Sequence, residues 1–177
     1  MDVPMTEILI TEEKLQARIK ELGEEITKDF AGKDVVVVGV LKGSFIFVAD
    51  LVRHIDLPLT LDFVACSSYG SSTVSSGVVR IMKDLDRPIE GKHVIVVEDI
   101  VDTGTTLDYL IKNFNSRGVA SLHLVTLLNK PERRKVDVPV DYTGFVIPDK
   151  FVGGFGLDYD ETYRHLPYIC VLDPERL

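Results

Sequence analysis

Acidic residues stand directly before a threonine-rich turn in the middle of the chain. Glu98 and Asp99 follow the apolar run at 94–97. The turn comprises Asp102, Thr103, Gly104, Thr105 and Thr106. Successive backbone N–H groups at the start of a helix converge on a phosphate, and the helix dipole favours its negative charge. Because glycine permits close approach and threonine hydroxyls add donors, the pattern predicts an anion-binding turn.

The acids beside this turn require a second kind of ligand group. Helix capping accounts for Asp102 and Thr103 without any ligand, but it leaves Glu98 and Asp99 unexplained at the end of an apolar strand. Adjacent carboxylates at such a position indicate recognition of hydroxyl groups or of a hard divalent cation. A phosphorylated sugar, together with magnesium, would use both halves of the segment. The segment is not a Walker loop, because it lacks Gly-Lys-Ser/Thr.

Strand and helix patterns alternate around this segment. Apolar runs and alternation predict strands at 34–41, 59–66, 77–85, 92–100 and 121–130. Helical spacing predicts helices at 11–30, 44–55 and 105–118. Thr11 is the predicted N-cap of the first helix and Gly118 the C-cap of the last, and 141–161 combines a short strand with a glycine-rich segment. Apolar strands that alternate with helices are typical of an α/β fold whose parallel sheet is covered on both faces.

Two strand-to-helix junctions carry polar residues where a ligand is expected. Open parallel sheets bind ligands beyond the carboxyl ends of their strands. The first junction is "VGVLKGS" at 38–44, and the second is "VVEDIVDTGTT" at 96–106. We therefore expect both junctions to contribute to one site.

Size and charge restrict the classes of partner. A chain of 177 residues suits a single domain, and its net charge of −8 argues against binding to nucleic acid or to acidic membranes. We expect no membrane span and no signal peptide, because no apolar run has the required length and the first residues lack a basic segment followed by an apolar one. Cys66 and Cys170 are expected as free thiols in a reducing compartment, so we expect a cytoplasmic protein.

The central segment resembles a known motif. An apolar strand, Glu98-Asp99 and then Asp102-Thr103-Gly104-x-Thr106 are similar to the phosphoribosyl-pyrophosphate (PRPP) motif of type I phosphoribosyltransferases. Four further segments resemble the hypoxanthine-guanine members of that family, in the same order along the chain. They are "LKGS" (41–44), "SSYG" (67–70), "LLNKPERR" (127–134) and "IPDKFVGGFGLDY" (147–159).

The resemblance implies a fold and a division of the chain. The fold would be a twisted parallel sheet flanked by helices, with a small hood subdomain. Residues 1–177 would form a single phosphoribosyltransferase domain, with the hood made by the N-terminal residues and roughly 145–177. A mobile lid would cover about 67–77, with Ser68 and Tyr69 closing over the site and excluding water.

The resemblance also implies an activity, the transfer of the 5-phosphoribosyl group from PRPP to N9 of hypoxanthine or guanine. The products would be IMP or GMP and pyrophosphate, and the cofactor Mg²⁺. The 5′-phosphate would be held by the backbone of Asp102 and by Thr103, Gly104, Thr105 and Thr106. Glu98 and Asp99 would face the ribose hydroxyls, directly or through magnesium.

The remaining roles concern pyrophosphate and the purine. Lys42, Gly43 and Arg164 would bind pyrophosphate, and the family often has a cis peptide at Leu41–Lys42. Asp158 would help to hold magnesium, and its segment would place backbone carbonyls near the purine 2-position. The other purine-binding residues would be Lys130 donating to the 6-oxo group, Phe151 stacking on the ring, Val152 pairing through its backbone, and Asp102 acting as general base or acid at N7.

Two other functions remain open at this point. One is a xanthine-preferring enzyme of the same reaction type, since the 2-position is read by backbone and Gly153 stands where relatives commonly have valine. The other is a regulator on the same fold that senses PRPP or nucleotides and binds RNA, against which the net charge argues. The family commonly forms dimers or tetramers, so we expect a homo-oligomer.

Overall fold

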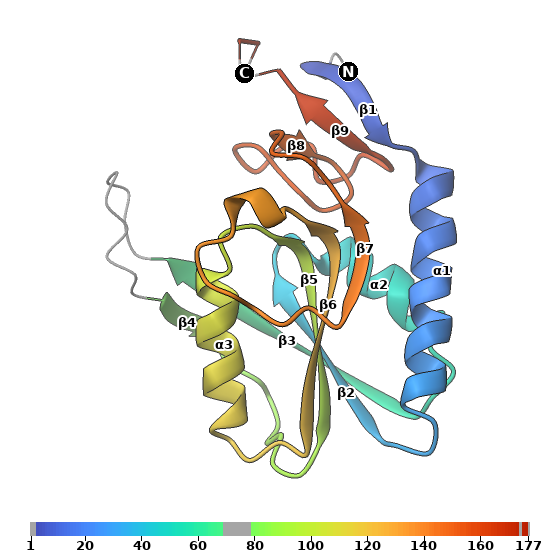
Figure 1. Ribbon diagram of the computed structural model, residues 1–177, viewed down its shortest axis with the longest axis vertical. Coiled ribbons are helices and arrows are strands. Elements are labelled where there is room, and N and C mark those ends of the chain that lie inside the picture. Colours follow the sequence, from blue (N-terminus) through green and yellow to red (C-terminus); the bar gives the residue numbers. More distant parts are fainter. Residues whose placement is uncertain (1–2, 69–78, 174, 177) are drawn as a thin grey trace.

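The computed structural model describes residues 3–68, 79–173, 175 and 176, which form two sheets and the helices around them (Figure 1). The six-stranded sheet has the order β4-β3-β2-β5-β6-β7, and the three-stranded sheet the order β1-β9-β8. The strands are β1 Met5–Ile10, β2 Val35–Leu41, β3 Leu59–Ser68, β4 Val79–Lys83, β5 His93–Val101, β6 Ser121–Asn129, β7 Tyr142–Val146, β8 Val152–Gly153 and β9 Ile169–Leu172. The helices are α1 Glu12–Asp29, α2 Phe45–Val52, α3 Thr105–Asn115 and the 3-10 helix η1 Pro131–Arg133.

The six-stranded sheet confirms the predicted α/β fold, with one difference in strand direction. Strands β3, β2, β5, β6 and β7 are parallel to one another, whereas β4 pairs antiparallel with β3. A parallel pair needs a crossover connection of about a dozen residues or more. Residues 69–78 are too few for such a crossover, so the next strand returns in the opposite direction.

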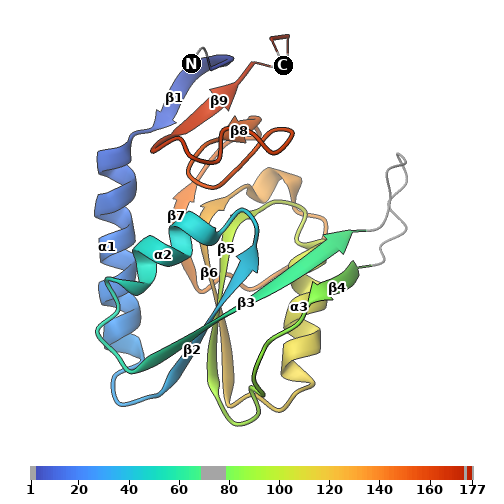
Figure 2. The same cartoon turned by 180° about the vertical axis from the view of Figure 1, so that it is seen from behind.

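Helices cover both faces of this sheet, with α1 and α2 on one face and α3 on the other (Figure 2). The predicted apolar stripe of α1 is fully buried and comprises Leu15, Ile19, Leu22 and Ile26. Thr11 caps this helix as predicted, because its hydroxyl oxygen accepts a hydrogen bond from the Lys14 N–H at 3.4 Å. The predicted end of α3 was wrong. The helix ends at Asn115 with Ser116 as its C-cap, and Gly118 follows with a φ of +75°.

The small sheet joins the two ends of the chain. Strand β1, which the sequence patterns did not predict, pairs antiparallel with β9, and β9 pairs antiparallel with β8. Figure 1 shows this sheet beyond the carboxyl ends of β2, β5 and β6. These strands lie within the parts of the chain expected to form the hood, so hood residues face the edge of the large sheet where the ligand is expected.

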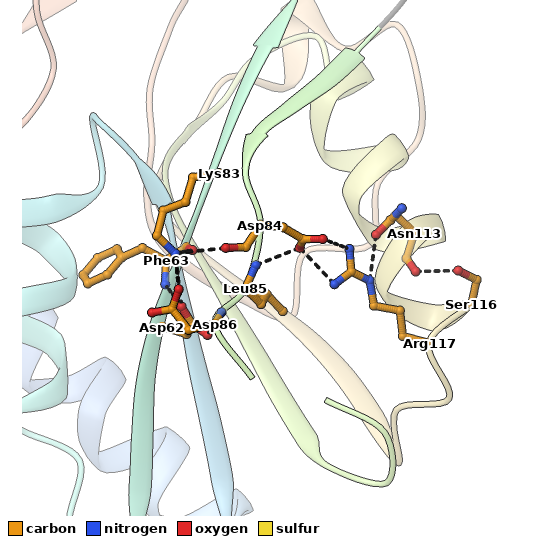
Figure 3. A network of polar contacts seen from close by, with 9 residues as sticks. All are labelled: Asp62, Phe63, Lys83, Asp84, Leu85, Asp86, Asn113, Ser116 and Arg117. Carbon is orange, nitrogen blue, oxygen red and sulfur yellow. Dashed lines mark hydrogen bonds and ion pairs between the residues drawn. The ribbon is translucent and has the colours of Figure 1, made fainter. Parts of the chain in front are cut away.

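A polar network fastens β4 to the body of the molecule (Figure 3). The Lys83 ammonium donates to the carbonyl oxygens of Phe63 and Asp84, both at 3.0 Å, and lies 3.6 Å from the Asp62 carboxylate. The guanidinium of Arg117, just beyond α3, pairs with Asp84 at 2.9 Å. The network therefore ties the outer strand of the sheet both to β3 and to the end of α3.

Both cysteines are free, Cys170 buried and Cys66 half-buried. Within the described ranges, no helix is long and apolar enough to span a membrane.

Candidate active site

The turn between β5 and α3 has the geometry of an anion site. Gly104 has a φ of +85°, and a Cβ at this position would lie 2.7 Å from the carbonyl oxygen of Val136. The Thr103 carbonyl accepts hydrogen bonds from the N–H groups of Lys135 and Val136, at 2.9 and 3.1 Å. Because the first N–H groups of a helix have no partner within it, the fixed turn presents donors at the start of α3.

These donors border a pocket of about 230 Å³ at the carboxyl ends of β2, β3 and β5. It is lined by Val40, Leu41, Cys66, Glu98, Ile100, Asp102, Thr103, Gly104, Thr106 and Leu107. A larger open hollow of about 840 Å³ lies at the opposite ends of β2 and β3, among residues that include Asp34 and Arg87. We place the candidate site at the smaller pocket, because open α/β sheets bind ligands at their carboxyl ends and the predicted residues Glu98, Asp102, Thr103, Gly104 and Thr106 line it.

Glu98 and Asp99 form an acid pair near the end of β5, in which Glu98 is buried and Asp99 half-buried. Glu98 is only 9% exposed and accepts a hydrogen bond from the Asp99 N–H at 3.2 Å. Burial raises the pKa of Glu98 well above its ordinary value, and the neighbouring charge of Asp99 raises it further. Burial also raises the pKa of Asp99, although hydrogen bonds from Glu98 and from the Ile100 N–H oppose that shift. Hydrogen bonds from hydroxyl donors stabilise the charged form of such a pair, and a cation neutralises its charge.

The loop after β2 packs directly against this acid pair. Its Leu41–Lys42 peptide is cis, the isomer that the family resemblance had suggested. A Cβ on Gly43 would lie 1.7 Å from Asp99 Oδ2, and one on Gly156 would lie 2.0 Å from the Gly43 carbonyl oxygen. A side chain at position 43 would displace the Asp99 carboxylate, and one at position 156 would clash with the Gly43 backbone. The two junctions and the segment near β8 therefore meet in close contact.

Lys42 and Arg164, the two predicted pyrophosphate cations, are brought together through Glu161. The Lys42 ammonium lies 2.8 Å from one Glu161 oxygen, and Arg164 Nη2 lies 3.4 Å from the other. Arg164 also pairs with Asp158 at 3.0 Å and donates to the Gly156 carbonyl at 2.8 Å. Its Nε is buried without a hydrogen-bond partner among the described residues. No sequence pattern singled out Glu161, one of several acids in a polar segment.

The predicted purine-binding residues come from β6, β8 and the segments around them. Lys130 is 6% exposed, and its N–H donates to the Val101 carbonyl at 2.9 Å, which holds it beside the β5 junction. Phe151 is 44% exposed and meets the ring of Tyr159 edge to face, with centroids 5.8 Å apart. Val152 begins β8, the outer strand of the small sheet, so one side of its backbone lies away from β9. Tyr159 was not predicted, because an isolated tyrosine carries no spacing signal.

Gly153 does not widen the purine site. A Cβ at this position would lie 2.9 Å from the Leu172 side chain, within the apolar cluster of the small sheet. Glycine here makes room for Leu172, so the departure from the family pattern concerns packing of the small sheet.

Part of the predicted lid lies outside the described residues. Ser68 is the last residue of β3, where its backbone pairs with Val79. Tyr69 and the rest of the predicted lid up to residue 77 are not among the described positions.

Comparison with known proteins decides the family. The family described as "Phosphoribosyl transferase domain" matches residues 6–160. The chain belongs to this family. The hypoxanthine-guanine phosphoribosyltransferase of Bacillus subtilis (strain 168) is 52% identical over 167 residues, which are 94% of this chain and 93% of the relative. The protein of the same name from Staphylococcus aureus (strain Mu50) is 53% identical over 171 residues, covering 97% and 96%.

Solved structures agree with the sequence relatives. A crystal structure of a hypoxanthine phosphoribosyltransferase from Staphylococcus aureus superposes with a TM-score of 0.95 at 52% identity, covering 98% of this chain and 94% of the other. A hypoxanthine-guanine phosphoribosyltransferase from Bacillus anthracis, with a HEPES molecule in its active site, gives a TM-score of 0.92 at 50% identity, covering 96% and 99%. The predicted family and fold are thus confirmed, and the relatives' names agree with the predicted enzyme class.

Proposed function

We propose that this phosphoribosyltransferase moves the 5-phosphoribosyl group of PRPP to N9 of hypoxanthine or guanine, releasing pyrophosphate. The observation that carries the proposal is the meeting of three features at one edge of the sheet. They are the anion-binding turn, the acid pair, and the buried Lys130, whose backbone N–H donates to Val101 beside the β5 junction. A ribose phosphate uses the first two, and a 6-oxo group uses the third. The names of the relatives support the same reaction.

The ribose 5′-phosphate would lie on the turn at 103–106, where N–H groups and threonine hydroxyls donate to it. Glu98 and Asp99 would accept hydrogen bonds from the 2′- and 3′-hydroxyls. The transferred group would thereby be held at both ends, and its C1′ would be oriented toward the purine.

Pyrophosphate would leave toward the cations beyond the acid pair. As the C1′–O bond breaks, the pyrophosphate oxygen takes the electron pair and positive charge develops on the ribose. Lys42, Arg164 and the backbone at Gly43 would stabilise the leaving anion. The acid pair would face the side of the ribose on which the positive charge grows.

The purine would lie between Phe151 and the β5 junction. Phe151 would stack on its ring and Val152 would pair with its edge through the backbone. Lys130 would donate to O6, and Asp102 would exchange a proton at N7 as N9 attacks C1′. Adenine carries a donor at position 6, so it would meet Lys130 donor to donor and be rejected.

Magnesium would be held jointly by substrate and protein. Over residues 3–68 and 79–173, no group of three or more histidine, cysteine or acidic side chains gathers as a metal site. Magnesium is commonly bound by one or two carboxylates together with substrate phosphates and water. The carboxylates of Glu98 and Asp99, and separately that of Asp158, fit this arrangement, in which the ion would neutralise pyrophosphate.

One assay tests the proposal. The purified protein is given PRPP and Mg²⁺ with hypoxanthine, guanine, xanthine or adenine, and nucleotide and pyrophosphate are measured. We expect turnover with hypoxanthine and guanine and none with adenine. A preference for xanthine would show that the proposed base is wrong. RNA binding without turnover would show that the protein is a regulator and not an enzyme.

The proposal includes a cytoplasmic location and self-association. Two free cysteines are compatible with a reducing compartment. Large apolar side chains are exposed on α2, β3 and β4, namely Phe45 at 43%, Leu61 at 45% and Met82 at 61%. Exposed side chains of this kind supply the apolar contacts that an interface between copies requires.

A further inference from the structure

Four charged side chains of alternating sign connect the groups assigned to N7 and to O6. Arg133 Nε lies 2.8 Å from Asp102 Oδ1, and Arg133 Nη1 lies 3.6 Å from Asp149 Oδ1. The Lys130 ammonium lies 3.7 Å from the same Asp149 oxygen. The chain Asp102–Arg133–Asp149–Lys130 therefore runs from the β5 junction, through η1 and the segment before β8, to the end of β6.

We propose that Arg133 and Asp149 are positioning residues, which fix Asp102 and Lys130 relative to each other along one edge of the purine. The inference rests on the roles proposed above for Asp102 and Lys130. O6 and N7 are neighbours on that edge, so the two groups that read them must be held at a set separation. Hydrogen bonds tolerate only a few tenths of an ångström in heavy-atom distance, and small misplacements of reacting groups lower rates strongly.

At the Asp102 end of this series of charges, Arg133 lies beside the carboxylate without forming a hydrogen bond to it. Asp102 Oδ1 is buried and has no hydrogen-bond partner among the described residues, although the Arg133 guanidinium is at ion-pair distance. The backbone of Asp102 is fixed separately, since its carbonyl accepts from Arg134 Nε at 3.1 Å. Arg133 thus orients the carboxylate through Oδ1, and the rest of the Asp102 side chain, which is 40% exposed overall, stays available to the purine.

At the Lys130 end, Asp149 likewise lies beside the ammonium at ion-pair distance without an ordinary hydrogen bond to it. A buried ammonium is strongly disfavoured unless a negative charge lies close to it. Asp149 supplies that charge at 3.7 Å, beyond the usual hydrogen-bond distance. The charge of Lys130 is compensated while its N–H groups remain free to donate to a 6-oxo group.

A contribution to the stability of the fold does not explain the position of Arg133. The side chains of Arg133, Asp102 and Asp149 are 48%, 40% and 43% exposed. Ion pairs at such exposure contribute little to the free energy of unfolding. Removing Arg133 should therefore leave the fold intact and change the reaction. Removing Asp149 also takes away the charge beside the Lys130 ammonium, whose side chain is only 8% exposed, so this change should lower the Tm as well.

The test compares Arg133→Met and Asp149→Asn with Arg87→Met and Asp34→Asn, the same substitutions at the opposite end of the sheet. We expect kcat/KM for hypoxanthine to fall by roughly tenfold in the first two variants. The KM for PRPP should stay near the value of the unmodified protein in both variants, and so should the Tm of Arg133→Met. The two control variants should match the unmodified protein in all three quantities.

A double-mutant cycle separates positioning from a general disturbance. If Arg133 acts through Asp102, Arg133→Met lowers kcat in the unmodified protein but has little further effect once Asp102→Asn is present. An equal loss in both backgrounds would overturn the proposal. Unfolding of Arg133→Met would overturn it as well, because the role would then be structural.

The cycle also separates this inference from the proposed function. Unimpaired turnover in Asp102→Asn alone would reject the role given to Asp102. Impaired turnover in Asp102→Asn, together with Arg133→Met and Asp149→Asn variants that match their controls, would reject only the positioning role.

Discussion

The three carboxylates of Glu98, Asp99 and Asp102 lie close together in the sequence but in different surroundings. Glu98 is buried beside the half-buried Asp99, whereas Asp102, only a few residues later, faces a guanidinium. Identical functional groups can therefore serve hydroxyl binding in one case and proton exchange in the other. The difference follows from burial and neighbours rather than from residue type.

The role of Asp102 leads to a kinetic prediction. Asp102→Asn keeps the size of the side chain and removes its ability to exchange a proton at N7. We expect kcat to fall by about 10²–10⁴-fold, the usual contribution of general acid–base catalysis. PRPP affinity should stay nearly unchanged, as measured by equilibrium binding. Full turnover in this variant would contradict the assignment.

The acid pair leads to a prediction about pH and stability. Because the pKa of Glu98 is raised on folding, the protonated carboxyl contributes stability below its unfolded pKa and loses it as the pH rises through the folded pKa. Glu98→Gln removes this titration. We expect the Tm of Glu98→Gln, relative to the unmodified protein, to increase between about pH 4 and pH 8.

Thermal unfolding with a chelator present, across that pH range, measures this difference without a bound cation. A Tm difference that does not change with pH would show that Glu98 has no raised pKa in the folded state.

The residue types of the site could be read from the sequence, but several of their partners could not. Glu98, Asp99 and the threonine turn lie together in the chain, and their spacing carries the chemistry. The structure alone reveals the roles of Arg133, Asp149 and Glu161, through their ion pairs. The partners are distant in the sequence, as Lys42 is from Glu161. Charged residues on polar segments look alike until the fold selects their partners.

At the scale of elements, the junction of β5 and α3 depends on one backbone conformation. Gly104 precedes the helix in the left-handed region, and the carbonyl of Val136 closes over it. The turn is thereby shaped by a loop that follows β6. The anion site belongs to two chain segments, although only one carries the motif.

This junction can be tested with a matched pair of glycine substitutions. Gly104→Ala adds a Cβ at positive φ and against the Val136 carbonyl, whereas Gly91→Ala adds one at a φ of +68° with nothing within 4 Å. The conformational strain alone is of order 1–3 kcal/mol at either site. We expect a lower Tm in both variants, a larger decrease for Gly104→Ala, and a raised KM for PRPP only for Gly104→Ala. Equal effects would exclude a special role of the turn.

Most elements could be predicted because their apolar patterns are long. In β2, β5, β6 and α1, the pattern of apolar residues follows directly from which side chains are buried. The direction of β4 and the end of α3 left weaker signals. Pairing direction depends on how the chain returns to the sheet, and helix ends depend on local capping geometry.

At the scale of the whole molecule, the site exists because the small sheet meets the large one. The Gly156 backbone contacts the loop at Gly43, which in turn contacts Asp99. Figure 2 shows the segment around β8 beyond the carboxyl ends of the large sheet. Segments from both halves of the chain therefore meet at the candidate site.

Self-association is the prediction at this scale. Leu61→Glu places a charge on a side chain that is 45% exposed on β3, so the fold should tolerate it. We expect the unmodified protein to sediment as a dimer or tetramer and Leu61→Glu to shift toward smaller species, because a charge disfavours an apolar interface. Asp34→Asn serves as a surface control. A monomeric unmodified protein would exclude the homo-oligomer.

The sequence by itself determined the family, the reaction class and the alternation of strands and helices that builds the large sheet. Motif residues such as Glu98 and Thr103 are neighbours in the chain, and apolar periodicity records burial. Only the tertiary structure decided which distant side chains meet, including Arg133 with Asp102 and Gly156 with Gly43. The physical reason is that these two kinds of interaction act over different distances along the sequence. Local backbone preferences act over a few residues, whereas pairing of charges and close backbone contact depend on how separate strands and loops are packed.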